Sequence, residues 1–390
     1  MRFLITNGHL NVGGGEKSLL NLLNNIDYAR HQVDLLLFEE LGDYYQLLPS
    51  AVNVTLFDLH PTYGSLKQTF LRSLKSGHFK DLLLKIVLLL YDRVHKKFIM
   101  FFKCFMKNQF SYDCAIAYRI GICTDFVSYA VKAPKKMMWW HHGEFNYNEN
   151  TVKKWLQVLD NIDNIVCVSK SSFDLILPYF YHYKERMCVL PNMIMINEIL
   201  SKGEEFNPYE KIDKRLFKVV SVGRLSPEKH MGDAVKAVRM LKERGYDYVI
   251  WFLVGDGVDM ENIKQSIADC HLEDEIVLVG NQSNPYPYIN YADLFVHLSY
   301  VESQGITVLE AMALNKLSVV TRSMGTDEFV IDGVNAFKAE QNVTSLVEKI
   351  EYAMNVHDNI SFYKQEQDKT VDKYQPKVIM PMFYNLVEQK

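Results

Sequence analysis

Residues 217–224 read Phe-Lys-Val-Val-Ser-Val-Gly-Arg, a short β-prone run that ends in a glycine. A helical pattern follows over 232–244, so the stretch predicts a strand, a glycine loop and a helix. The N-terminus has the same order, with an apolar run over 1–6, the turn Gly13-Gly14-Gly15-Glu16 and a leucine-rich helical segment. Because the pattern starts twice, the sequence predicts two units of the same kind.

Further β-prone runs alternate with helical or loop segments in both halves of the chain. This alternation is typical of a parallel sheet covered by helices, so each half is expected to form a doubly wound, Rossmann-like α/β domain. Strands are expected at 32–38, 52–57, 114–118, 136–140 and 164–169, and then at 248–254, 275–279, 294–298 and 317–321.

The domain boundary is expected near residue 195, inside a linker that runs from Pro191 to Pro208. This predicts a first domain over 1–195 and a second over 196–373. Residues 374–390 are expected to form a terminal helix that is broken by Pro376 and Pro381 and crosses back to the first domain.

The composition is that of an ordinary globular protein. Of 390 residues, 48% are apolar and 23% are charged, and the formal net charge is -4. Nucleic-acid-binding domains are normally strongly basic, so we expect no nucleic-acid partner. The six cysteines include no CxxC pair and no signal peptide precedes the first strand, so we expect a cytoplasmic protein without disulfides or structural zinc. The apolar stretch from Leu82 to Tyr91 contains Lys85 and is too short to span a membrane.

Two glutamates stand eight positions apart in Glu302-Ser-Gln-Gly-Ile-Thr-Val-Leu-Glu310, which continues Ala-Met-Ala. On a loop that enters a helix, this spacing places both carboxylates beside one cleft. The start of a helix presents unpaired N–H groups and a positive dipole end, so the backbone of Gly305, Ile306 and Thr307 is suited to an anionic phosphate without a metal. The two carboxylates are then placed to hydrogen-bond sugar hydroxyls.

The stretch from Glu302 to Ala313 resembles the signature of glycosyltransferase family 4, whose members have the GT-B fold of two Rossmann-like domains facing a cleft. Residues 221–229, Ser-Val-Gly-Arg-Leu-Ser-Pro-Glu-Lys, resemble the diphosphate-binding stretch of that family. Short motifs one at a time are weak, and the joint occurrence carries the resemblance. Further motifs in the family's order are Val168-Ser169, Leu190-Pro-Asn192, Val254-Gly-Asp-Gly257, Gly325-Thr-Asp-Glu328 and Asp332-Gly-Val-Asn335. The first half is covered only weakly, through Gly13 to Glu16 and Trp139-Trp-His-His-Gly143.

The resemblance implies a role for each candidate residue on the donor side. Arg224 and Lys229 would hold the donor diphosphate in place of a divalent cation, and the chain has no D-x-D metal motif. Glu310 would bind the ribose hydroxyls, and Glu302 would lie beside the transferred sugar. The backbone of Gly223 and Gly255 would line the same pocket. No metal and no cofactor other than the nucleotide-sugar co-substrate is implied.

The candidates on the acceptor side carry weaker signals. Gly14 and Gly15 would let the backbone approach the sugar and the acceptor, with Glu16 a lesser candidate, but a glycine turn also begins many Rossmann units. The family's histidine near the sugar aligns best on His142, with His141 as the alternative because the residue is doubled. A histidine at a strand end is about as often structural as catalytic.

The sequence departs from the family's pattern at two positions. Gln304 stands where the family usually has a bulky residue, which is expected to bear on the choice of sugar. Asn335-Ala336 replaces the commoner Asn-Gly and is expected to alter only a turn.

Residues 62–111 are strongly basic. Ten lysines and arginines against Asp81 and Asp92 give +8, with aliphatic and aromatic side chains in between. Such a stretch suits an anionic lipid surface, so we expect peripheral attachment of the first domain to the inner face of the cell membrane. The alternative is two helices with their apolar face inward and their lysines in solvent. The basic residues are Lys67, Arg72, Lys75, Lys80, Lys85, Arg93, Lys96, Lys97, Lys103 and Lys107.

These features predict a retaining, metal-independent glycosyltransferase. It would move a hexose or N-acetylhexosamine from a nucleotide-diphosphate sugar, with UDP favoured over GDP, to a lipid-linked or oligosaccharide acceptor in cell-surface polysaccharide or glycolipid assembly. Retention is implied by the resemblance alone. Two alternatives stay open: a nucleotide-sugar 2-epimerase of the same fold, and a catalytically silent transferase-like subunit that binds a partner enzyme at the membrane. The presence of Arg224, Lys229, Glu302 and Glu310 argues against the silent subunit.

Overall fold

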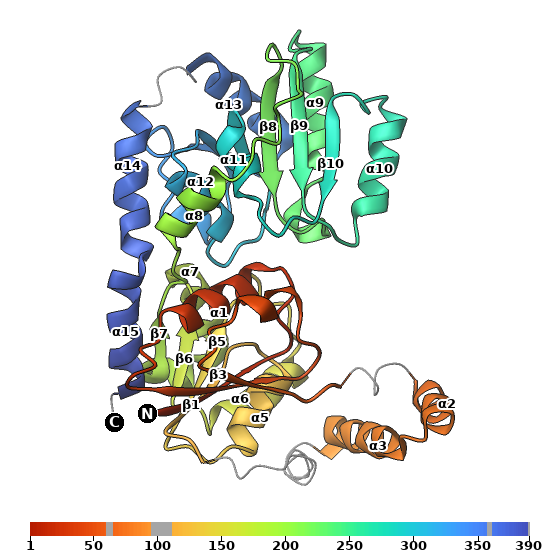
Figure 1. The fold of residues 1–390 in the computed structure, drawn as a ribbon, viewed down its shortest axis with the longest axis vertical. Helices are drawn as coiled ribbons and strands as arrows, with labels where there is room; N and C mark the ends of the chain where they lie inside the picture. The colour runs from red at the N-terminus through yellow and green to blue at the C-terminus, as the bar shows by residue number, and fades with distance from the viewer. Residues whose placement is uncertain (60–64, 95–110, 357–360, 389–390) are drawn as a thin grey trace.

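A computed structural model of the chain describes residues 1–59, 65–94, 111–356 and 361–388. Within them the chain forms two α/β domains, one above the other in Figure 1, with a C-terminal helical segment that runs along both. The expected fold class, two Rossmann-like domains each with a parallel sheet, is confirmed. No helix of the described ranges is long and apolar enough to cross a membrane.

The first domain is built on a parallel seven-stranded sheet in the order β3-β2-β1-β4-β5-β6-β7. Side chains alternate between its two faces, so that Phe3 and Ile5 belong to the core on one face and Leu4 to the core on the other. The strands are β1 (Arg2–Asn7), β2 (Gln32–Leu37), β3 (Val52–Leu56), β4 (Cys114–Ala117), β5 (Lys135–Trp140), β6 (Asn164–Cys167) and β7 (Met187–Val189). The helices are α1 (Gly14–Asn24), α2 (Leu66–Ser76), α3 (Phe79–Val94), α5 (Ile122–Tyr129), α6 (Glu149–Leu159) and α7 (Lys170–Phe180).

The second domain is built on a parallel six-stranded sheet in the order β10-β9-β8-β11-β12-β13. Its strands are buried on both faces and therefore read as continuous apolar runs, as in β9, where all six residues are buried. The strands are β8 (Phe217–Val222), β9 (Val249–Val254), β10 (Ile276–Gly280), β11 (Leu294–His297), β12 (Ser318–Thr321) and β13 (Phe337–Ala339). The helices are α8 (Ile196–Gly203), α9 (Asp233–Glu243), α10 (Met260–Asp269), α11 (Tyr286–Tyr291), α12 (Ile306–Ala313), α13 (Val343–Val356) and α14 (Ser361–Val371).

Two short strands were not anticipated from the sequence. β7 and β13 have three residues each, which is too short for a recognisable apolar run. They extend the two sheets at one edge, where β7 pairs with β6 and β13 pairs with β12.

The expected linker is partly helical, because α8 lies inside it. Ile199 of α8 is buried in the second domain together with Ile194, so burial of these side chains holds the segment against the sheet. The chain therefore leaves the first domain after β7 and joins the second within a few residues.

The expected break in the terminal helix at Pro381 is wrong. Helix α15 (Pro376–Glu388) starts at Pro376, where the missing N–H costs little, and continues through Pro381. Ile379, Met380 and Phe383 are buried in the core of the first domain, so packing holds the helix despite the lost hydrogen bond. Figure 1 shows α14 beside the second domain and α15 beside the first.

Candidate active site

A cleft of about 1280 Å³ lies between the two domains and is lined by both. In a doubly wound sheet, ligands bind outside the carboxyl ends of the strands at the point where the strand order reverses. The lining follows this rule, since it includes the segments after β1, β4, β5, β8, β9 and β11. Every candidate residue from the sequence lines this cleft: Gly14, Gly15, His141, His142, Gly223, Arg224, Lys229, Gly255, Glu302, Gly305, Ile306, Thr307 and Glu310.

Glu302 lines the cleft and is held there by two neighbours. The Lys229 ammonium donates to Glu302 Oε1 at 2.6 Å, and His297 Nε2 lies 3.1 Å from the same oxygen. The carboxylate side chain is only 14% exposed. Burial raises the pKa of Glu302, but Lys229 and His297 outweigh it and lower the pKa to about 2. Glu302 is therefore ionised at neutral pH, and the contacts that hold it leave Oε2 available for a ligand.

Glu310 lies one turn inside α12 in a different environment. It is buried, and it accepts a hydrogen bond of 2.8 Å from the Tyr286 hydroxyl. Burial raises the pKa of Glu310 to about 6, although the hydrogen bond from Tyr286 and the charge of Lys17 act in the opposite direction. The two glutamates thus differ in pKa because one has a cation in direct contact and the other does not.

The cationic side of the site comes from the loop between β8 and α9. Gly223 and Arg224 follow β8, and Lys229 ends a short 3₁₀ helix, η4 (Pro227–Lys229). Gly255 supports this loop, because a β-carbon there would lie 1.9 Å from the carbonyl oxygen of Gly223. Arg224 is exposed to the cleft, and no hydrogen bond or ion pair ties its guanidinium to another described residue.

No group of three or more His, Cys, Asp or Glu side chains is placed to hold a metal ion in the ranges described.

Across the cleft, a β-carbon on Gly13 would lie 3.8 Å from Nη2 of Arg224, so the two loops approach each other closely. The guanidinium of Arg224 therefore lies near the start of α1.

The loop that carries Glu302 is enclosed by two glycines from different parts of the chain. A β-carbon on Gly143 would lie 2.5 Å from the backbone carbon of Glu302, and one on Gly325 would lie 2.5 Å from that of Ser303. Only glycine permits this approach without displacing the loop. Gly143 was quoted in the sequence as part of a motif, but its contact with the second domain could not be read from its position.

Gln304 lines the cleft, but its amide is bound by the backbone of Asn192. Its side chain is 3% exposed, Oε1 accepts from the Asn192 backbone N–H at 2.8 Å, and Nε2 donates to the Asn192 carbonyl at 3.1 Å. Asn192 in turn accepts a hydrogen bond from Ser18 of α1. The amide is therefore used to fasten the Glu302 loop to the segment between the domains. The expected effect of Gln304 on the choice of sugar stays a prediction.

The first domain presents the start of α1 and the two histidines. A β-carbon on Gly14 or Gly15 would meet no atom within 4 Å, so the backbone here borders open space. The His141 ring packs against Tyr118 with ring centroids 4.8 Å apart and the planes tilted by 43°, and its Nε2 is buried without a hydrogen bond in the described structure. Burial, with the charge of His142, lowers the pKa of His141 to about 3, whereas burial and the charge of Arg119 lower the pKa of the more exposed His142. Which of the two rings contacts the sugar stays a prediction.

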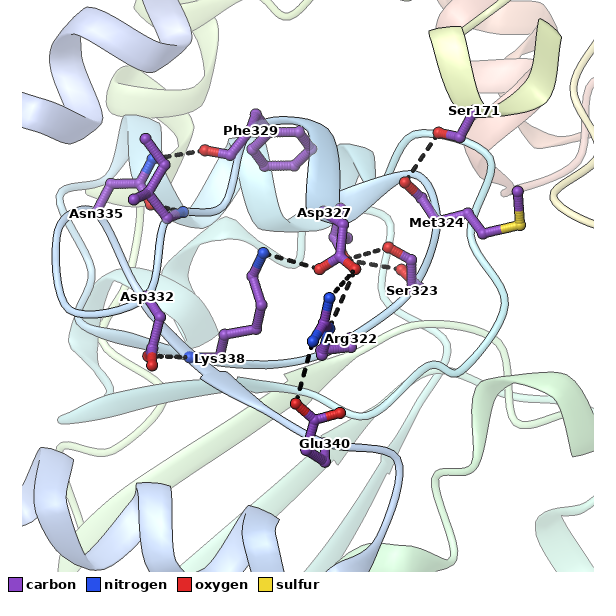
Figure 2. Close-up of polar contacts among 12 residues, drawn as sticks. Ser171, Arg322, Ser323, Met324, Asp327, Phe329, Asp332, Asn335, Lys338 and Glu340 are labelled. Atoms are coloured by element: carbon purple, nitrogen blue, oxygen red, sulfur yellow. Dashed lines mark hydrogen bonds and ion pairs between the residues drawn. The ribbon is translucent and has the colours of Figure 1, made fainter. Parts of the chain in front are cut away.

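The motif residues Gly325 to Asn335 form a scaffold behind the site. Figure 2 shows Asp327 paired with Arg322 and Lys338, at 3.2 and 2.8 Å. Asn335 donates to the Phe329 carbonyl at 2.7 Å. The Ser171 hydroxyl at the start of α7 donates to the Met324 carbonyl at 2.8 Å, which joins this scaffold to the first domain. The polar groups of this stretch are thus satisfied within the protein and hold the domains together.

Comparison with known proteins places these features in a family context. Residues 203–370 match the family model described as glycosyl transferases group 1. The GPI3 subunit of phosphatidylinositol N-acetylglucosaminyltransferase from Saccharomyces cerevisiae is 24% identical over 55% of this chain and 49% of its own length. The poly(glycerol-phosphate) alpha-glucosyltransferase of Bacillus subtilis is 30% identical over 40% of this chain and 24% of its own length. The chain spans less than half the length of these curated relatives.

Solved structures are similar over the whole chain. Anabaena HepE in complex with UDP-glucose has a TM-score of 0.74 at 18% identity, over 100% of both chains. S. aureus TarM, in a complex that contains UDP, has a TM-score of 0.73 at 14% identity, again over 100% of both chains. At these identities the likeness establishes the fold. The chain therefore has the GT-B fold, and its second domain carries the sequence pattern of the group 1 glycosyl transferases.

Proposed function

We propose that the protein is a retaining glycosyltransferase that takes a hexose or N-acetylhexosamine from a UDP-sugar. The observation that carries the proposal is the convergence of Arg224, Lys229 and the start of α12 around one side of the cleft, with Glu302 and Glu310 beside them. The complexes of HepE with UDP-glucose and of TarM with UDP support the choice of UDP over GDP.

The diphosphate would lie between the cationic loop and α12. The first N–H groups of α12 have no carbonyl partner within the helix, so they are donors for phosphate oxygens. Arg224 and Lys229 add two fixed charges, and Lys229 would be shared between Glu302 and the phosphate. These groups stabilise the negative charge that develops on the leaving diphosphate.

The two glutamates would orient the donor from either side of the diphosphate. Glu310, ionised above pH 6, is placed to accept hydrogen bonds from the ribose hydroxyls. Glu302 is ionised throughout the neutral range and would accept hydrogen bonds from hydroxyls of the transferred sugar through Oε2.

In the transfer step, the bond between the anomeric carbon and the diphosphate oxygen breaks. The acceptor oxygen forms the new bond on the same face of the sugar, and its proton passes to the departing diphosphate. The protein's part is to hold both partners and to stabilise charge, which is the work that the cations and the helix N-terminus can do without a metal.

The acceptor would be a lipid-linked sugar or an oligosaccharide of a cell-surface polysaccharide or glycolipid, reached from the cytoplasmic side of the membrane. The names of the yeast and Bacillus relatives, a phosphatidylinositol glycosyltransferase subunit and a poly(glycerol-phosphate) glucosyltransferase, support an acceptor of this class.

The test is incubation with UDP-glucose, UDP-galactose, UDP-N-acetylglucosamine, UDP-N-acetylgalactosamine and GDP-mannose, with and without a bacterial lipid extract. We expect release of UDP from one donor, faster when the extract is present. Lys229→Ala should lose this activity, whereas Lys236→Ala, an exposed lysine of α9 that pairs with Asp233, should keep it.

Other outcomes would identify the alternative functions. Conversion of a UDP-sugar into its 2-epimer, without transfer to an acceptor, would indicate the epimerase. Failure to bind or turn over any donor in a folded protein would indicate the silent subunit. NMR of the product's anomeric proton would decide between retention and inversion.

A further inference from the structure

Helices α2 and α3 extend from the side of the first domain as a helical hairpin (Figure 1). The sequence fixes both ends of α2. Ser65 and Gln68 form a reciprocal capping box at its start, and Gly77 adopts the left-handed conformation at its end, with a φ of 73°. Helix α2 therefore has defined ends that the sequence specifies, and the hairpin lies outside the sheet of the domain.

The amphipathic pattern of α2 is inverted relative to an ordinary surface helix. Thr69 and Ser73, one turn apart, are buried. Phe70 and Leu74, also one turn apart, are 43% and 51% exposed. Leu66 and Leu71 are exposed as well. Small polar residues thus occupy the protein side of the helix, and large apolar residues face outward.

Helix α3 adds a second outward apolar stripe. Phe79, Leu83 and Ile86, spaced four and three residues apart, lie along one side of the helix and are all exposed. The alternative drawn from the sequence, in which both helices turn their apolar face inward, describes Leu84, which is buried in the core of the first domain, but not these three residues. Exposed large apolar side chains gathered on two helices that contact each other are typical of an interaction site.

The same hairpin is basic. Residues 65–86 contain one acid, Asp81, against the five bases Lys67, Arg72, Lys75, Lys80 and Lys85. Lys67 and Lys75 are exposed along α2, and Lys80 is exposed at the start of α3. The charges therefore stand among the apolar side chains of the outward surface.

We propose that the α2–α3 hairpin docks onto an anionic phospholipid membrane. Its apolar side chains would enter the boundary of the acyl chains, while the lysines remain at the level of the headgroups. The charge decides between occupants, because a second copy of the chain would bring two sets of like charges together, whereas acidic lipids neutralise them. The basic residues expected to act over 95–110 lie outside the described residues and are not needed for this proposal.

The experiment is co-sedimentation of the full chain with vesicles, without nucleotide sugar, so that its outcome does not depend on the proposed activity. Vesicles of phosphatidylcholine mixed with the anionic lipid phosphatidylglycerol are compared with pure phosphatidylcholine, at low and high salt. We expect binding to the anionic vesicles that weakens as salt rises.

Two variants separate the charge from the apolar surface. The change of Lys67, Lys75, Lys80 and Lys85 to Gln should weaken binding by about 25-fold or more, since each lysine near the surface contributes about 5-fold and two engaged lysines already give that loss. The change of Phe70, Leu74, Phe79 and Leu83 to Gln should weaken binding to a similar degree. In the matched control, four lysines of the second domain and the C-terminal segment, Lys211, Lys214, Lys264 and Lys373, are changed to Gln, and binding should stay within about 2-fold of wild type because those side chains are remote from the hairpin.

Equal binding by the wild type and both hairpin variants would overturn the proposal, as would binding that is indifferent to lipid charge and salt. Absence of vesicle binding, together with a concentration-dependent dimer that the Phe70, Leu74, Phe79 and Leu83 variant abolishes, would assign the surface to self-association instead. Circular dichroism of each variant checks that the fold is retained.

Discussion

Lys229 and Glu302 show how a single ion pair sets the character of the candidate site. The carboxylate is nearly buried, yet its pKa is lowered because the ammonium lies 2.6 Å away. The same pair keeps Lys229 in the cleft, where a diphosphate could contact it. An ion pair with little solvent access is costly to break on one side only, since the remaining charge is left without a partner.

Replacement of either cation should impair turnover. Lys229→Ala and Arg224→Ala are each expected to lower kcat/KM by about 10- to 1000-fold, the range for loss of an electrostatic stabiliser of the transition state. The measurement is UDP release under steady-state conditions. Full activity of either folded variant would show that the diphosphate binds elsewhere.

Glu310 predicts a pH effect on stability. Because its folded pKa of about 6 exceeds its ordinary value of 4.5, the folded protein binds more protons than the unfolded chain between these values. Stability from this group is therefore full below pH 4.5 and is lost as pH rises through 6. The free energy of unfolding of Glu310→Gln should exceed that of the wild type by about 2 kcal/mol at pH 7.5 and should equal it at pH 4.5. Thermal unfolding at both pH values tests this, and a lower melting temperature for the variant at pH 7.5 would contradict it.

At the scale of elements, the loop from Glu302 to Gly305 lies between β11 and α12 and contacts the boundary between the domains. Gln304 makes two hydrogen bonds to the backbone of Asn192, and the Ser303 backbone lies against Gly143 and Gly325. Movement of one domain against the other therefore moves the loop that carries Glu302. Gln304 is a positioning residue in this arrangement, because its amide is already satisfied by the protein.

Gln304→Met tests this role with a side chain of similar length. This substitution removes the amide and leaves the buried backbone N–H and C=O of Asn192 unpaired, which costs about 1 kcal/mol for each group. We therefore expect kcat to fall by about 5- to 30-fold. UDP affinity should change less than about 2-fold, because the amide is not free to bind a ligand. Gln282→Met, another cleft glutamine, is the control and should leave kcat unchanged. An equal fall in UDP affinity for Gln304→Met would place its amide in the donor pocket.

At the scale of the whole molecule, two similar domains meet along one cleft, and several polar contacts join them. The Glu328 carboxylate accepts from the backbone N–H of Lys170 at the start of α7, and Lys17 of α1 pairs with Glu198 of α8 at 3.0 Å. Helix α15 adds apolar packing against the first domain. Contacts made by α1 and α7 thus join the two domains.

The assembled cleft predicts activity without a divalent cation. Cations from the second domain and the N-terminus of α12 face the region where the diphosphate is proposed to lie, so excess EDTA should leave at least about 80% of the activity. The measurement is UDP release after dialysis against EDTA, with a metal-dependent glycosyltransferase as a parallel control. Loss of activity that Mg²⁺ or Mn²⁺ restores would refute metal independence.

The sequence by itself determined the two-domain architecture and the residues of the candidate cleft. Buried parallel strands are written as continuous apolar runs, and the loops after them carry glycines and charges in a recognisable order, so both signals are local. Eleven strands of the described fold, β1 to β12 without β7, could be placed within a few residues in this way.

Only the tertiary structure decided what Gln304, Gly143 and the α2–α3 hairpin do. Gln304 contacts Asn192 across 112 positions of sequence, and Gly143 contacts Glu302 across a still longer stretch of sequence. No local pattern therefore encodes these partners. In α2 the spacing of apolar residues was visible, but a helix with one apolar stripe has the same sequence whether that stripe is turned toward a core or toward solvent. The direction in which the apolar stripe faces depends on which other parts of the chain pack beside the helix. In this structure Phe70 and Leu74 are left exposed.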